Sequence, residues 1–88
     1  MGSPYVHFLE QLSSIYDTDY GDYMRKVNCY LTELKEDKSA IKTPEILKKI
    51  EEIQDYIQYE PNWDIPTTQK KVLKDTEKLI YLEAVNSP

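Results

Sequence analysis

The stretch TPEILKKIEEIQDYI, residues 43–57, decides the fold of this chain. It opens with two signals of a helix start, since a threonine side chain caps free N–H groups and proline fits the first helical position. Four isoleucines follow at steps of four, three and four residues: Ile46, Ile50, Ile53 and Ile57. This spacing gives a helix one apolar face, which must be buried against other elements. We therefore predict a helix near residues 44–60 that Pro61 ends.

Similar spacing recurs before and after this stretch. Ser3 and Pro4 can start a helix near residues 4–16, and Thr18 or Asp19 can start another near 19–35. A fourth helix is predicted near residues 65–85. The expected apolar faces comprise Tyr5, Phe8, Leu9, Leu12, Ile15 and Tyr16 in the first helix, Tyr20, Met24, Val27, Leu31 and Leu34 in the second, and Val72, Leu73, Thr76, Leu79 and Ile80 in the fourth.

Four amphipathic helices joined by short connections can bury their apolar faces only against one another. The predicted fold class is therefore all-α, an antiparallel four-helix bundle that forms a single domain over residues 1–88. An alternative interpretation of Met1, Gly2 and Ser3 is that they are a cloning remnant. Most tyrosines are expected at the edge of the core, where the ring packs and the hydroxyl reaches water: Tyr5, Tyr16, Tyr20, Tyr23 and Tyr30.

The charge of the chain argues against general nucleic-acid binding. Sixteen acidic and eleven basic residues give a net charge of −5, whereas a nucleic-acid-binding protein needs a basic surface. The charges are also segregated: residues 25–49 hold seven basic and four acidic groups, while residues 50–69 hold five acids and no base. Such separation suits electrostatic steering of a protein partner.

The residues needed for catalysis are scarce. His7 is the only histidine, and it is expected to point away from the apolar face of its helix. The chain has no Ser/His/Asp set, no glycine-rich phosphate loop and no His/Cys metal spacing. The segment Asp17–Asp22 resembles a calcium loop only superficially, because its glycine and final glutamate are not in place. We expect no enzyme activity, no cofactor and no metal.

Cys29 is the only cysteine, so no disulfide can form within the chain. The longest apolar run, Leu79–Leu82, is far shorter than a membrane span, and the first residues show no signal-peptide pattern. We expect a cytoplasmic (intracellular) protein that does not bind membranes.

A partner-binding surface is predicted where acidic and aromatic residues gather near the end of the third helix. Its members are Glu51, Glu52, Asp55, Tyr56, Tyr59, Glu60, Trp63 and Asp64. Tyrosine and tryptophan dominate binding hot spots, and the acids favour a partner with a basic surface. In the alternative, Tyr59 folds back with the ending helix and Trp63 covers the end of the bundle.

A second candidate contact lies near the end of the fourth helix. Tyr81, Leu82 and Val85 extend the apolar character of this helix beyond one face. The helix is then either central and packed on several sides, or it makes a contact in a homodimer or with a partner. We expect a monomer or a weak homodimer.

Two resemblances accompany this hypothesis. The acidic helix with neighbouring tyrosines, Glu51-Glu52…Asp55-Tyr56…Tyr59-Glu60, is similar to the small immunity proteins of bacteriocin systems, which implies an inhibitor-like role against a basic toxin. The paired tyrosines of the nuclease-colicin immunity family are absent. The stretch Cys29–Val85 resembles, in helix order, the helical modules of transcription elongation factors, which implies peptide docking within a larger regulatory protein. The hypothesis is a non-enzymatic protein–protein interaction module; an assembly subunit is the alternative.

Overall fold

The described part of the chain forms four helices. The computed structural model describes residues 4–40, 43–59 and 64–86, with α1 at Pro4–Ser13, α2 at Tyr20–Glu36, α3 at Pro44–Tyr59 and α4 at Ile65–Asn86. No strand occurs in these three ranges. The predicted all-α class is confirmed, and the bounds of α2, α3 and α4 agree with the predicted ones to within one residue.

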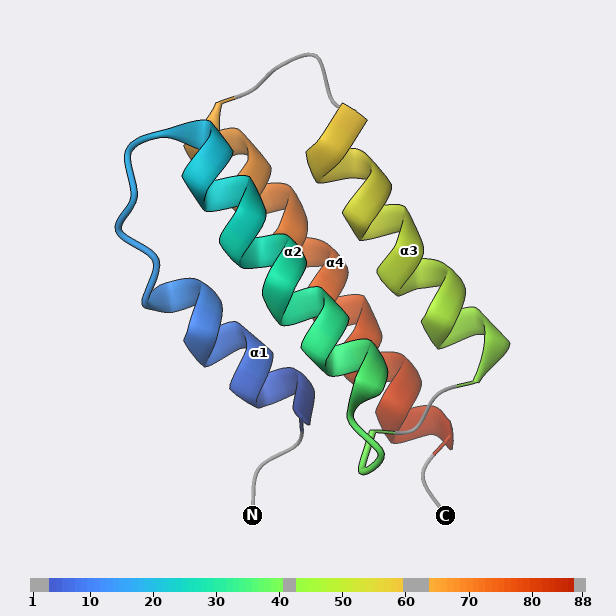
Figure 1. The fold of residues 1–88 in the computed structure, drawn as a ribbon. Coiled ribbons are helices and arrows are strands. Elements are labelled where there is room, and N and C mark those ends of the chain that lie inside the picture. The colour runs from blue at the N-terminus through green and yellow to red at the C-terminus, as the bar shows by residue number, and fades with distance from the viewer. Residues whose placement is uncertain (1–3, 41–42, 60–63, 87–88) are drawn as a thin grey trace.

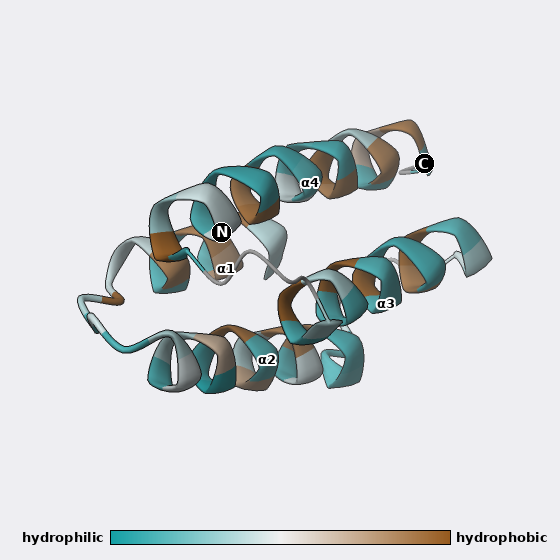
Figure 2. Cartoon of the chain, turned by 90° about the horizontal axis from the view of Figure 1, so that it is seen from above, coloured by the Kyte–Doolittle hydropathy of each residue, from teal (hydrophilic) through white to brown (hydrophobic). Residues whose placement is uncertain are grey.

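Successive helices run in opposite directions, so that the start of α1 and the end of α4 lie at the same end of the bundle (Figure 1). Each helix contacts the next one along the chain, and α1 also contacts α4. Hydrophobic and hydrophilic segments alternate along each helix (Figure 2), as expected for helices with one apolar face. The chain forms the predicted antiparallel four-helix bundle.

The isoleucines of α3 form one wall of the core. Ile46, Ile50, Ile53 and Ile57 are all at most 1% exposed, which confirms the predicted apolar face. On α4 the buried apolar residues Val72 and Leu79 alternate with buried polar ones: Thr68, Asp75 and Thr76.

Side-chain caps explain where three of the helices begin. The Asp19 carboxylate accepts a hydrogen bond from the Asp22 N–H (3.1 Å), and the Thr43 hydroxyl accepts one from the Ile46 N–H (3.3 Å). Asp64 accepts one from the Thr67 N–H (3.2 Å). Each of these bonds satisfies an N–H group that has no partner within its own helix. The predicted cap Ser3 lies outside the described residues.

Helix α1 ends at Ser13, three residues earlier than predicted. The hydroxyl of Ser13 donates to the Leu9 carbonyl (3.1 Å) and that of Ser14 to the Gln11 carbonyl (2.7 Å). Serine hydroxyls that bond nearby carbonyls compete with helix continuation. Tyr16 therefore lies beyond the helix and is 87% exposed, and its predicted place at the edge of the core was wrong.

Two tyrosines lie deeper than predicted. Tyr5 and Tyr23 are at most 1% exposed, and Tyr23 rather than Tyr20 faces the core from the first turn of α2. Tyr20 instead donates its hydroxyl to the Ile57 carbonyl in the last turn of α3 (2.7 Å). Burial raises the pKa of Tyr5 to about 12, with Glu83 and Asp37 adding to the shift, and burial likewise raises the pKa of Tyr23 to about 12.

Candidate protein-binding surface

The outer face of α3 carries most of the predicted binding residues. Glu51, Glu52, Asp55 and Tyr59 are all exposed, on the side of the helix opposite the buried isoleucines. Tyr59 is 72% exposed, so its ring does not fold back onto the core. The structure thus brings three carboxylates and one accessible aromatic ring onto one helix surface, which we call the acidic face.

Two of the predicted residues are held by lysines. The Glu52 carboxylate lies 3.6 Å from Lys49 Nζ, and the half-buried ring of Tyr56 has Lys71 Nζ 5.7 Å from its centroid. The side chains of Glu51, Asp55 and Tyr59, by contrast, make no ion pair or hydrogen bond with another described residue. These three side chains are the part of the acidic face most accessible to a partner.

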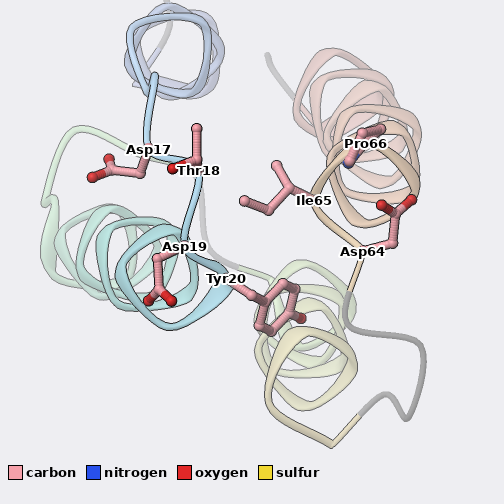
Figure 3. A pocket seen from close by; sticks show the side chains of 7 residues that line it. All are labelled: Asp17, Thr18, Asp19, Tyr20, Asp64, Ile65 and Pro66. Atoms are coloured by element: carbon pink, nitrogen blue, oxygen red, sulfur yellow. The ribbon is translucent and has the colours of Figure 1, made fainter.

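Asp64 lies apart from the acidic face, at the start of α4. It forms one wall of an open hollow of about 460 Å³. The α1–α2 connection forms another wall, and Figure 3 shows the carboxylates of Asp17, Asp19 and Asp64 pointing away from one another. Asp17 pairs with Lys26 (2.6 Å), while Asp19 and Asp64 cap helices. These three carboxylates therefore serve the local structure and do not converge on a ligand.

Glu60 and Trp63 lie outside the described residues, so their predicted part in the surface stays a prediction.

The structure exposes two of the three residues of the second predicted contact and partly buries the third. Tyr81 and Val85 are 68% and 61% exposed, whereas Leu82 is partly buried and packs against the core. Leu82 therefore belongs partly to the bundle itself. The accessible part consists of two apolar side chains one helical turn apart.

Asp75 is the residue that the sequence did not single out. It is only 3% exposed, and Lys49, Lys71 and Lys78 surround it at N···O distances of 3.4, 3.0 and 3.9 Å. The spacing of Lys71, Asp75 and Lys78 predicts ion pairs along one helix. The position of Asp75 between Val72 and Leu79 also places it on the buried side of α4, but no spacing within α4 predicts the contact with Lys49 of α3.

The described residues offer no metal centre: no group of three or more His, Cys, Asp or Glu side chains within 4–40, 43–59 and 64–86 could hold a metal ion. His7 and Cys29 are both exposed, and His7 Nδ1 lies 4.0 Å from Glu10. None of the helices in the described part of the chain combines the length and apolar character that a membrane crossing requires. Comparison with protein families, curated proteins and solved structures finds no match to this chain.

Proposed function

We propose that this chain is a non-enzymatic protein-binding module whose acidic face binds a partner with a basic surface. The observation that carries the proposal is the 72% exposure of Tyr59 beside the exposed carboxylates of Glu51 and Asp55. An inhibitor-like or immunity-like role is one form of this function.

Folding alone gives no reason to gather these groups. Neighbouring acids on a helix repel one another by a few tenths of a kcal/mol per pair, and an exposed tyrosine ring adds nothing to the core. A basic partner supplies the reason, because the carboxylates speed its encounter and the ring provides a short-range anchor.

The test begins with a pull-down that uses tagged protein and identifies the partner. Glu51→Lys combined with Asp55→Lys should then slow association and flatten its salt dependence. Glu52 is left unchanged, because Lys49 already neutralises part of its charge. Tyr59→Ala should act mainly on dissociation, with a loss of roughly 2 kcal/mol or more if Tyr59 is a hot spot.

The matched control is Glu36→Lys combined with Glu77→Lys, which makes the same change in net charge at exposed sites on α2 and α4. Its association rate should fall much less than that of the α3 variant. Equal rates for the wild type, the α3 variant and Tyr59→Ala across a salt series would place the binding site elsewhere.

The second candidate function is an assembly subunit, favoured by the exposed pair Tyr81 and Val85. If the chain is an assembly subunit, sedimentation of the wild type at rising concentration shows a homodimer. The double variant Tyr81→Glu with Val85→Glu should then be a monomer. Leu82 is unsuitable for this test, because it packs against the core. A wild type that stays monomeric at high concentration excludes this candidate.

A further inference from the structure

The face shared by α3 and α4 holds a group of ammonium ions next to the acidic face, to which the ion pair of Lys49 with Glu52 links it. Three lysines lie within 4.0 Å of the Asp75 carboxylate: Lys49, Lys71 and Lys78. We call these three residues the lysine cluster. Lys49 comes from α3 and the other two from α4, so the cluster lies across the junction of the two helices.

Positive charge is in surplus at the cluster. Asp75 and Glu52 are the two carboxylates paired with it, against three ammonium groups. Lys74 is exposed and lies between Lys71 and Lys78 on the same side of α4, three residues from one and four from the other. Glu77, also exposed, is three residues from Lys74, so four lysines stand against three carboxylates. This part of the surface keeps a surplus of one positive charge, although the whole chain has a net charge of −5.

The ammonium groups are also held in position before any ligand arrives. Asp75 is buried on α4 and holds Lys71 and Lys49 at 3.0 and 3.4 Å, with Lys78 at a longer distance of 3.9 Å. The Tyr56 ring further restricts Lys71 through the cation–π contact of 5.7 Å. An anion that binds here orders fewer side chains than it would at mobile surface lysines, and its loss of conformational entropy is smaller.

The shape of the cluster selects the kind of anion. The side chains of Lys71 and Lys78 are 42% and 57% exposed, and each ammonium has three donors, not all of which Asp75 can accept. Lys71, Lys74 and Lys78 form a row of roughly 10 Å along α4, at about 1.5 Å per residue. A row of this length meets several carboxylates of one chain, whereas a single small anion contacts only part of it.

We propose that the lysine cluster, together with Lys74, binds a carboxylate-rich segment of a partner protein. This surface adjoins the acidic face at the ion pair of Lys49 with Glu52, but the proposal does not depend on the function suggested for that face. A chain with both surfaces can hold a basic partner and an acidic segment at the same time.

The test uses a fluorescently labelled polyglutamate peptide of about eight residues, long enough at roughly 3.4 Å per residue to cover the row. Its anisotropy is titrated with the full chain at low salt and at about 0.15 M salt. Lys74→Gln with Lys78→Gln should weaken binding about tenfold, the equivalent of about 1.4 kcal/mol. This pair spares Lys49 and Lys71, which make the two shorter contacts with Asp75, so the melting temperature should stay close to that of the wild type.

Lys35→Gln with Lys38→Gln is the control, because it removes the same charge at the end of α2 and just beyond it. Helix α2 lies diagonally opposite α4 in the bundle. Binding should change by less than about twofold. An absence of peptide binding, or equal losses in both double variants, overturns the proposal. Displacement of the peptide by inorganic phosphate, but not by chloride at equal ionic strength, also overturns it in favour of a phosphate site.

Glu51→Lys with Asp55→Lys separates this proposal from the function of the acidic face. That variant should bind the polyglutamate peptide at least as well as the wild type, whatever its effect on a basic partner.

Discussion

Helices α3 and α4 pack against each other, yet they bury different chemistry. The inner face of α3 consists of four isoleucines, whereas that of α4 interleaves Val72 and Leu79 with Thr68, Asp75 and Thr76. Both faces are almost fully buried. A wholly apolar face can therefore share a core with a face that carries three polar side chains.

The three buried polar side chains of α4 differ in their partners. The Thr76 hydroxyl donates to the Val72 carbonyl of its own helix (2.7 Å), and lysines surround Asp75. The Thr68 hydroxyl finds no hydrogen-bond partner among the described residues. On both helices, then, the position of a residue on the helix determines its burial, while the pairing of the buried polar groups of α4 differs from one residue to the next.

The largest loss of stability is expected for truncation of a buried isoleucine of α3. Ile53→Ala should lower the free energy of unfolding by about 2–5 kcal/mol, because the truncated side chain leaves a cavity in a packed core. Urea unfolding followed by circular dichroism measures the loss. Glu51→Ala on the outer face should change stability by less than about 0.5 kcal/mol, and a similarly small loss for Ile53→Ala would mean that the isoleucine face is not the core.

A smaller effect is expected at the ion pairs of α4. Asp75→Asn should lower the free energy of unfolding by roughly 1–3 kcal/mol, because the lysine charges lose their buried counter-charge. Lys71 and Lys78 can turn toward water, which keeps the loss below that of Ile53→Ala. The same urea experiment on Glu77→Gln, an exposed acid two residues away, serves as the control; equal effects of the two changes would show that the cluster contributes nothing specific.

The smallest effect at neutral pH is expected for Tyr23→Phe. The Tyr23 hydroxyl is buried without a hydrogen-bond partner among the described residues, so its removal should raise the free energy of unfolding by up to about 1 kcal/mol. A loss of more than about 1 kcal/mol would show that the hydroxyl has a partner that holds it in place.

The difference in stability between Tyr23→Phe and the wild type should grow at alkaline pH. The folded-state pKa of Tyr23 is raised to about 12 from 10.0, so the folded state retains a proton that the unfolded state releases. The contribution of Tyr23 to the free energy of unfolding is therefore fully present below pH 10 and is lost as the pH rises toward 12. Unfolding measured at several pH values should show a shallower alkaline loss for Tyr23→Phe than for the wild type, whereas the exposed control Tyr59→Phe should follow the wild type.

The fold was predictable because its main determinants are local. Isoleucine spacing and the caps at Asp19 and Thr43 depend only on residues within one or two helical turns. The end of α1 was predicted too late, because the hydrogen bonds of Ser13 and Ser14 compete with an apolar pattern that continues to Tyr16. These bonds are also local, but apolar spacing does not report them.

The candidate sites were predictable only in part, because they depend on more than one helix. The exposure of Tyr59 follows from its position on α3. Glu52 pairs with Lys49 three residues earlier in the same helix, a spacing that the sequence contains. The contact of Lys71 with Tyr56, and the ion pair of Lys49 with Asp75, follow from the way α3 meets α4. No pattern within a single helix contains these two contacts.

The hydrogen bond from Tyr20 to the Ile57 carbonyl has a consequence for the order of folding. The last turn of a helix has carbonyls without partners, and here one of them is satisfied by a side chain 37 residues earlier in the sequence. The final turn of α3 thus reaches its full stability only after the start of α2 has docked beside it. The two helices are thereby coupled at this end of the bundle, so fraying of one loosens the other, and local opening there involves both chain segments together.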